Sequence, residues 1–354
     1  MAPAFVHLYN PGYEAALSLP EEKSRGYMPP KSVIRLRKDL ATLPLYLARE
    51  GEKVLVPDDL PDALLTPLMT KRIGPGETLR PWGWSPELSK ICEAPFTFDE
   101  MRYLTDRVRS VELFGKILAA DDGRHFERGT ILPRLIHPGE SYPAYPHVLK
   151  QRFSSSGRGV RFVTAPPDVS HQKHTGDPVI VEPLYPKEQD LGFEFYRHPD
   201  GSVAFLGTSL FDTVAGRYTG NRLNDPLKSE IEKEYSLYID LLASVLSEFD
   251  LKGYSGPIGI DTLTYFSGGK RRIAPLIEIN IRPTMGLLAL ELEKRFPRST
   301  RFGIKVGHVP TEGPAAQAPL YLSPDSHPAH ISPGLYPLTP MLPDTRFTAL
   351  IEIH

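Results

Sequence analysis

Three polar side chains stand at alternate positions in an otherwise apolar run. Within residues 276–286, Glu278, Asn280 and Arg282 alternate with isoleucines. Successive side chains of a strand point to opposite faces, so these three would share one face. A carboxylate, an amide oxygen and a guanidinium placed together suit an oxygen-donor metal site beside a phosphate-binding arginine. A half-exposed strand with one polar side is the alternative interpretation.

A second carboxylate comes from the preceding run, residues 259–263, where Asp261 stands among mostly apolar neighbours. The glycine pair at 268–269 predicts a hairpin turn that pairs this run with the one carrying Glu278. A two-residue turn places Asp261 opposite Leu276 and diagonal to Glu278, whereas two further loop residues place it directly opposite Glu278. Either register puts both carboxylates on one face. Such a pair repels unless a cation lies between them or one stays protonated, which indicates Mg²⁺ held by carboxylates and substrate phosphates.

A loop rich in serine and glycine lies earlier in the chain, between two predicted strands. The strand before it, residues 147–153, contains Lys150, which can supply a point charge to a phosphate. Backbone N–H groups and hydroxyls of the loop can fold over phosphates. The loop residues concerned are Ser154, Ser155, Ser156, Gly157 and Gly159. The order of a P-loop, G-x-x-x-x-G-K-[ST], is absent, and a hairpin turn that binds nothing is the alternative.

An apolar run at residues 179–184 predicts a buried strand that contains Glu182 and ends at Leu184. Backbone groups at such a strand end can hydrogen-bond an adenine edge, and Asp190 downstream can hold ribose hydroxyls. Alone, this pattern is a weak indication of a nucleotide pocket.

The surrounding sequence predicts the elements that would position these residues. The chain opens with a strand, a helix and a strand, which form a βαβ unit, at residues 5–9, 31–49 and 54–56. Prolines recur up to residue 95, and we expect a domain boundary there. A helix at 98–120 precedes short strands typical of an antiparallel sheet. A long helix that begins at Pro226 and ends before Gly253 interrupts this series.

Composition limits the classes of function. The chain has 354 residues, enough for two or three domains, and its 41 basic and 43 acidic residues leave a net charge of -2. This balance argues against binding to nucleic acid. The single cysteine, Cys92, can form neither an internal disulfide nor a cysteine-based metal site. We see no signal peptide and no apolar run of the roughly 20 residues of a membrane helix, and we expect a cytoplasmic protein without a membrane partner.

Taken in order, these motifs resemble the ATP-grasp superfamily. That family has a lysine before its central domain, a strand-borne lysine followed by a phosphate loop, an acid at the adenine pocket, a ribose-binding acid and an Asp…Glu-x-Asn metal triad. The resemblance spans roughly residues 100–300, and Glu-x-Asn-x-Arg-Pro is its most specific element. It implies that ATP is bound by Lys116, Lys150, Ser154 to Gly159, Glu182, Leu184 and Asp190, and the metal by Asp261, Glu278 and Asn280.

The resemblance also implies an α/β (α+β) chain with an ATP-grasp fold. Its parts would be an N-terminal βαβ pre-ATP-grasp domain at 1–95, the ATP-grasp domain at 96–312 and a proline-rich, β-like C-terminal extension at 313–354. The implied enzyme is a ligase that uses ATP and one or two Mg²⁺, with Mn²⁺ as an alternative, to make an acyl phosphate that an amine, or less readily a thiol, captures. The substrates would be small-molecule or peptide carboxylates and amines, and a homodimer is compatible with this. A non-catalytic ATP-binding regulatory or scaffold module would use the same cleft.

One position departs from the family pattern. Many ligases of this family carry an arginine two residues before the metal-binding aspartate, where this chain has Gly259. Arg217, Arg222 or Arg282 would replace that charge, and we expect Arg282 and Arg217 to act in catalysis.

Overall fold

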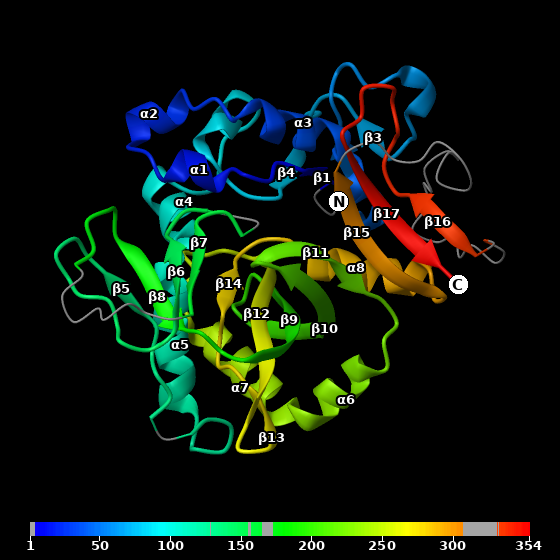
Figure 1. Ribbon diagram of the computed structural model, residues 1–354. Coiled ribbons are helices and arrows are strands. Elements are labelled where there is room, and N and C mark those ends of the chain that lie inside the picture. The colour runs from blue at the N-terminus through cyan, green and yellow to red at the C-terminus, as the bar shows by residue number, and fades with distance from the viewer. Residues whose placement is uncertain (1–3, 128, 155–156, 165–172, 307–330, 332) are drawn as a thin grey trace. The chain divides into compact units, whose positions relative to one another are not determined.

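The computed structural model describes residues 4–127, 129–154, 157–164, 173–306, 331 and 333–354 (Figure 1). The predicted loop residues Ser155 and Ser156, and residues 313–330 and 332 of the predicted C-terminal extension, lie outside this part. The chain divides into two units, each built from segments distant in sequence. The first comprises Met1–Phe98, Thr219–Pro226 and Met285–His354, and the second comprises Asp99–Tyr218 and Leu227–Thr284.

The first unit opens with a parallel sheet in the strand order β3-β2-β1-β4. Its strands are β1 (Ala4–Leu8), β2 (Lys53–Leu55), β3 (Met69–Thr70) and β4 (Glu77–Pro81). The connection from β1 to β2 contains the helices α1 (Glu14–Leu17), α2 (Glu21–Arg25) and α3 (Lys31–Asp39) and the 3₁₀ helix η1 (Leu43–Tyr46). Two further 3₁₀ helices are η2 (Asp62–Leu64) and η3 (Pro86–Lys90). Because β1 and β2 run parallel across this helical connection, the predicted βαβ start is confirmed.

Two later segments, Thr219–Pro226 and Met285–His354, add a helix and antiparallel strands to the first unit. These are β11 (Arg217–Arg222), α8 (Met285–Arg295), β15 (Ser299–Val306), β16 (Gly334–Pro337) and β17 (Phe347–Ile353). β15 pairs with β11 and with β17, and Leu288, Phe302 and Ile351 share one core with Tyr46. Residues 285–306, which the sequence analysis places in the central domain, therefore pack with the N-terminal segment.

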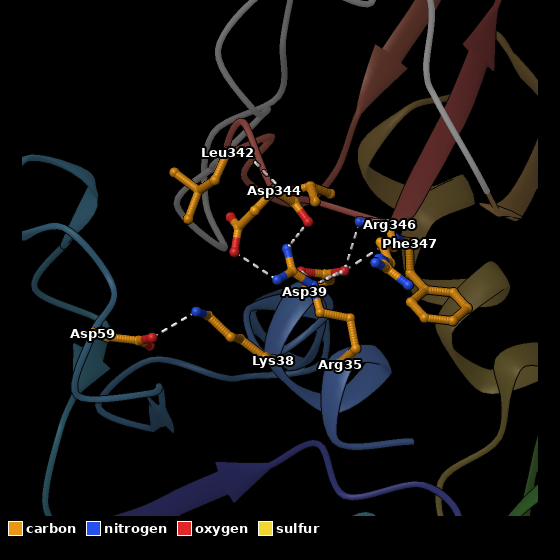
Figure 2. A network of polar contacts seen from close by, with 9 residues as sticks. Arg35, Lys38, Asp39, Asp59, Leu342, Asp344, Arg346 and Phe347 are labelled. Atoms are coloured by element: carbon orange, nitrogen blue, oxygen red, sulfur yellow. Dashed lines mark hydrogen bonds and ion pairs between the residues drawn. The ribbon is translucent and has the colours of Figure 1, made fainter. Parts of the chain in front are cut away.

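A polar network, which we call the C-terminal network, attaches the start of β17 to α3 (Figure 2). Arg35 donates to Asp39 at 2.9 Å and to the Asp344 carboxylate at 2.6 Å. The buried Asp39 also accepts the backbone N–H groups of Arg346 and Phe347 at 2.9 and 3.1 Å. The end of the chain is thus fixed by bonds to α3 as well as by strand pairing.

The second unit contains two sheets and four helices among the residues that the structure describes. The smaller sheet, in the order β5-β8-β6-β7, consists of β5 (Arg134–Ile136), β6 (His147–Gln151), β7 (Val160–Val163) and β8 (Val179–Pro183). The larger one runs β13-β12-β9-β10, with β14 also paired to β12. Its strands are β9 (Lys187–Arg197), β10 (Val203–Val214), β12 (Gly256–Ser267), β13 (Lys270–Ile273) and β14 (Glu278–Asn280).

Helices cover one face of the larger sheet. They are α5 (Val108–Ala120), α6 (Leu227–Glu234) and α7 (Ser236–Glu248), and α4 (Phe98–Thr105) precedes them in the chain. On β9, Leu191, Phe193 and Phe195 alternate with other residues and are buried in one core with Tyr238 and Leu242 of α7. This burial of one face leaves the alternate positions of β9 and β12 to form the opposite face. Mixed parallel and antiparallel sheets with helices confirm the predicted α/β (α+β) class.

Among the described residues, no helix combines the length and the apolar character that crossing a membrane requires.

Candidate functional site

The two carboxylates predicted to bind a metal lie opposite each other on neighbouring strands. β12 pairs with β14 so that Asp261 is opposite Glu278. Nearer the hairpin, Thr264 of β12 is opposite Ile273 of β13, which is the register of a two-residue turn. The pairing therefore shifts by two residues between β13 and β14. Both registers that the sequence analysis considered are therefore present: the two-residue-turn register between β12 and β13, and the register with directly opposed carboxylates between β12 and β14.

Asn280 and Arg282 continue this row of polar side chains. Asn280 donates from Nδ2 to Oδ2 of Asp261 at 3.0 Å, and Arg282 donates from Nη2 to Oδ1 of Asn280 at 2.8 Å. Arg282 also donates from Nη1 to the carbonyl oxygen of Pro283 at 3.0 Å. The amide of Asn280 thus links the guanidinium to the carboxylate, as expected for side chains that share one face.

Arg107 belongs to this group of residues although the sequence analysis did not identify it. It precedes α5, its side chain is only 6% exposed, and its Nε donates to Oε1 of Glu278 at 2.9 Å. Its Nη1 donates to the carbonyl oxygen of Gln151 at 2.7 Å and to the hydroxyl of Ser154. One arginine therefore connects a predicted metal ligand with the start of the predicted phosphate loop.

Lys116 lies elsewhere on the same helix. It is exposed and stands nine residues after Arg107, which is about 13 Å further along the helix axis. A signal for Arg107 was present in the sequence: Asp106 is a helix-start residue, and its carboxylate accepts the N–H of Val108 at 3.1 Å. Recognising that helix start would have placed Arg107 at the end of α5 that meets the strands.

Lys150 forms a buried ion pair with the acid predicted for the adenine pocket. Its Nζ lies 2.7 Å from Oε1 of Glu182, and the two side chains are 8% and 9% exposed. The same Nζ donates to the carbonyl oxygen of Ile277, next to Glu278, at 3.0 Å. Lys150 therefore joins the smaller sheet to the strand that carries the metal-binding residues. We call Arg107, Lys150, Glu182, Asp261, Glu278, Asn280 and Arg282 the site cluster.

Burial and mutual charge alter the protonation of the acids in the site cluster. Burial, together with the charge of Glu278, raises the pKa of Asp261 to about 7. Burial also raises the pKa of Glu182, although Lys150 acts in the opposite direction. For Glu278, burial favours the neutral form, but the positive charges of Arg107 and Lys150 prevail and its pKa is lowered. Near neutral pH the raised pKa leaves Asp261 partly protonated. A proton on one carboxyl reduces the repulsion between Asp261 and Glu278 when no cation lies between them.

The donor set fits a divalent cation that prefers oxygen ligands. Asp261, Glu278 and Asn280 offer two carboxyls and an amide on one face. Within the described part of the chain, no group of three or more His, Cys, Asp or Glu side chains is arranged to hold a metal by itself. A cation here would take the remaining ligands from water or from a bound phosphate, as Mg²⁺ commonly does.

The glycines of the predicted phosphate loop occupy positions that other residues cannot. Gly157 and Gly159 have φ of +72° and +70°, in the left-handed region. A Cβ at Gly157 would lie 2.2 Å from the carbonyl oxygen of Gly216, and one at Gly159 would lie 2.4 Å from Oε1 of Gln151. The loop therefore approaches both the turn between β10 and β11 and the end of β6 closely.

The groups predicted to contact adenine and ribose differ in whether they are already hydrogen-bonded in a way that suits the nucleotide. The N–H of Leu184 donates to the carbonyl oxygen of Pro146 at 3.1 Å, so an adenine edge would have to exchange this bond. Asp190 lies on β9 and accepts from Lys187 at 2.6 Å and from the hydroxyl of Thr213 at 2.8 Å. A carboxylate fixed in this way is oriented to accept hydroxyl hydrogen bonds.

Of the three arginines considered as replacements at Gly259, only Arg282 lies in the site cluster of the described structure. Arg217 is exposed at the start of β11, and its Cα would be 3.1 Å from a Cβ at Gly157. Arg222 belongs to the first unit and pairs with Asp225 at 3.1 Å.

Comparisons with known proteins give the fold. No family model matches the chain. An ATP-grasp superfamily protein from Archaeoglobus fulgidus is similar over 99% of both chains, with 12% sequence identity and a TM-score of 0.51. N5-carboxyaminoimidazole ribonucleotide synthetase from Thermus thermophilus matches 99% of this chain and 93% of its own, at 14% identity and a TM-score of 0.46. An L-amino acid ligase from Bacillus licheniformis matches 75% of this chain and 71% of its own, at 12% identity and a TM-score of 0.42.

Proposed function

Because this chain has the ATP-grasp fold, we propose that it is an ATP-dependent ligase. A substrate carboxylate oxygen attacks the γ-phosphorus of ATP, and ADP leaves, which yields an acyl phosphate. An amine nitrogen, or less readily a thiol, then attacks the acyl carbon, phosphate leaves and the amine loses a proton. The observation that carries this proposal is the site cluster, in which three cationic side chains converge on the row formed by Asp261, Glu278 and Asn280.

Phosphoryl transfer depends on alignment and on compensation of charge more than on a protein nucleophile. Lys150 and Arg107 are buried and fixed, so they can meet the phosphates with little loss of side-chain freedom. Arg282 extends this positive charge toward the terminal phosphate. Asp261, Glu278 and Asn280 would hold Mg²⁺, which neutralises phosphate charge when it is bound.

The remaining predicted residues would hold the rest of the nucleotide. Ser154, Gly157 and Gly159 offer a hydroxyl and backbone N–H groups to the phosphates, together with Ser155 and Ser156. Asp190 would accept the ribose hydroxyls, and Glu182 would keep Lys150 in place near the adenine strand. Lys116 and Arg217, which are both exposed, would add positive charge at the periphery of the nucleotide site. The acceptor would be a small-molecule or peptide amine, and the active species a monomer or a homodimer.

The test is release of ADP. Purified protein is incubated with ATP, Mg²⁺ and pooled carboxylic acids and amino acids, and ADP is measured with and without the pool. Release that depends on the pool supports a ligase. Tight binding of MgADP without such release would instead favour the non-catalytic ATP-binding module, and absence of nucleotide binding would overturn both.

A matched pair of variants on α5 sharpens this test. Arg107→Met should weaken MgADP binding by about tenfold or more, because a buried charge next to the phosphates is lost. Lys116→Met, on the exposed side of the same helix, should change it less than about twofold. The reverse order would show that the family's first ATP-binding lysine corresponds to Lys116 after all.

A further inference from the structure

Glu194 is a buried acid for which the proposed function has no role. It lies on β9 between Phe193 and Phe195, and it is 2% exposed. The two phenylalanines face the helices, so Glu194 lies on the opposite face of the sheet. On that face it is paired with Gly259 of β12, two residues from Asp261. A carboxyl group this deeply buried needs partners that satisfy it.

Two hydroxyls supply them. Thr284 donates from Oγ1 to Oε2 of Glu194 at 2.7 Å, and Ser209 donates to Oε1 at 3.4 Å. Burial raises the pKa of Glu194 to about 8, against the effect of the Thr284 hydrogen bond and with the effect of the charge on Asp261. The charge of Arg282 acts in the opposite direction and lowers this pKa, so the Glu194 carboxyl lies within electrostatic reach of that guanidinium.

Two glycines make the space in which this carboxyl lies. A Cβ at Gly259 would stand 2.4 Å from Cγ2 of Thr284 and 3.2 Å from Oε2 of Glu194. A Cβ at Gly192 would stand 2.5 Å from Oγ of Ser209 and 3.1 Å from Oε1 of Glu194. The position where many family members carry an arginine is thus filled from the neighbouring strand and from Thr284, and no side chain fits there.

Thr284 connects this buried contact to the site cluster. It follows Arg282 by two residues, and Arg282 is held in turn by the carbonyl of Pro283 and by Asn280. We propose that Glu194 is a positioning residue that, through Thr284, fixes the 282–284 segment and so aims Arg282 at the terminal phosphate of ATP. This inference rests on the proposed function. In it, Glu194, Thr284 and Gly259 together position Arg282, the arginine that would supply the charge that many family members carry at the position of Gly259.

Thr284 allows the hydrogen bond and the packing to be separated. Thr284→Val keeps the methyl group that contacts Gly259 and removes the hydroxyl, whereas Thr284→Ser keeps the hydroxyl and removes the methyl group. Thr208→Val is the matched control, since Thr208 is likewise a buried threonine but lies on β10 and is paired with Phe193, whose side chain faces the helices. Glu194→Gln keeps an oxygen that can accept the Thr284 hydroxyl.

Binding of MgADP and of a non-hydrolysable MgATP analogue is measured by calorimetry for each variant. Thr284→Val should weaken binding of the analogue by about tenfold and binding of MgADP by less than about twofold, because only the terminal phosphate, which ADP lacks, would contact Arg282. Thr208→Val should bind both nucleotides like the unmodified chain, whereas Thr284→Ser and Glu194→Gln, which keep the hydrogen bond, should each lose less affinity for the analogue than Thr284→Val does. Thr284→Ala replaces the valine variant if that variant does not fold.

The proposal is overturned if Thr284→Val binds the analogue as the unmodified chain does, or if it loses ADP and the analogue equally, as a merely structural defect would cause. An equal loss in Thr284→Ser would overturn it as well, because the methyl contact would then be the determinant. If the unmodified chain binds neither nucleotide, the proposed function fails and the positioning role fails with it.

A second variant pair tests the space beside Gly259. Gly259→Ala should weaken binding of the analogue, because its Cβ displaces Thr284. The double variant Gly259→Ala/Thr284→Ser should restore it, because the atom 2.4 Å away is gone. Failure of the serine to restore binding would contradict the assigned packing.

Discussion

The C-terminal network of the first unit and the site cluster of the second both join cationic side chains to acids, yet their charges are satisfied differently. In the first, Arg35 bonds two carboxylates, and Asp39 also accepts two backbone N–H groups (Figure 2). The hydrogen bond from Arg35 lowers the pKa of Asp344, so this network stabilises the ionised form of that carboxyl. In the second, burial raises the pKa of Asp261 to about 7 and also raises that of Glu182.

The difference indicates which network is built for a ligand. A network that only supports the fold gains most when every charge has a partner within the protein. Acids kept buried and partly protonated are unfavourable in the free protein, and they become favourable when a cation enters. By this criterion we interpret the C-terminal network as structural and the site cluster as the place where the proposed function would bind its metal and phosphates.

The largest effect is expected for Glu278→Gln. The change preserves volume and an oxygen that can accept from Arg107, but it removes a full charge from the proposed metal site, so turnover of ATP should fall on the order of a thousandfold. The melting temperature should stay close to that of the unmodified chain. Asp344→Asn in the C-terminal network is the control and should leave turnover unchanged. Turnover near normal in Glu278→Gln would refute the metal assignment.

Lys150→Met tests the buried ion pair of the site cluster. It leaves Glu182 buried without its cation, and the free energy of unfolding should fall by about 3 kcal/mol. Denaturant titration measures this, and calorimetry should show weaker binding of MgADP. Adding Glu182→Gln should recover stability but not nucleotide affinity. Recovery of both would mean that Lys150 serves the fold alone.

Asp39→Asn tests the C-terminal network in the same way. It weakens three hydrogen bonds at a buried position, and we expect a loss of about 2 kcal/mol in the free energy of unfolding without any change in nucleotide affinity. The neighbouring pair between Lys38 and Asp59, 2.5 Å apart and more exposed, provides the control. Lys38→Met should change stability by less than about 1 kcal/mol. A nucleotide effect in Asp39→Asn would remove the distinction between the two networks.

The two networks should respond to pH with opposite sign. The pKa of Asp261 in the folded chain, about 7, is above its ordinary value of 3.8, so between these values the folded state holds a proton that the unfolded state has lost. Stability from this group therefore falls as pH rises from 4 to 7, by at most about 1.4 kcal/mol for each pH unit. Asp344, with a lowered pKa, instead loses its contribution as pH falls below its ordinary range.

Variants separate the pH dependence of stability that comes from Asp261 from that of the other titrating groups. Asp261→Asn should flatten the stability curve between pH 5 and 7 relative to the unmodified chain, while Asp344→Asn should flatten it only below pH 4. Mg²⁺ with ADP should stabilise the unmodified chain more at pH 8 than at pH 6, since the cation competes with the proton. Parallel curves for the unmodified chain and Asp261→Asn would show that Asp261 is ionised throughout.

Local patterns in the sequence are sufficient for the fold class and for the row of site residues. Alternation of polar and apolar residues around Glu278 places three side chains on one face because the strand repeat is two, whatever the strand packs against. The same reasoning gave the antiparallel strands, and the order of motifs gave the ATP-grasp fold, which is confirmed. The roles assigned to individual site residues stay predictions.

The tertiary structure decided what depends on contacts between distant segments. The register that sets Asp261 opposite Glu278 comes from two extra residues between β13 and β14, in a segment where Pro275 indicates a break in the strand but not how far the pairing shifts. Arg107, and not Lys116, bonds Glu278, because it stands at the start of α5 whereas Lys116 is on the exposed side of that helix. Alternation along β9 places Glu194 on the face opposite Phe193 and Phe195. The role proposed for it depends on the space at Gly259 and on the hydroxyl of Thr284. Both result from packing between distant segments, which no local pattern reveals.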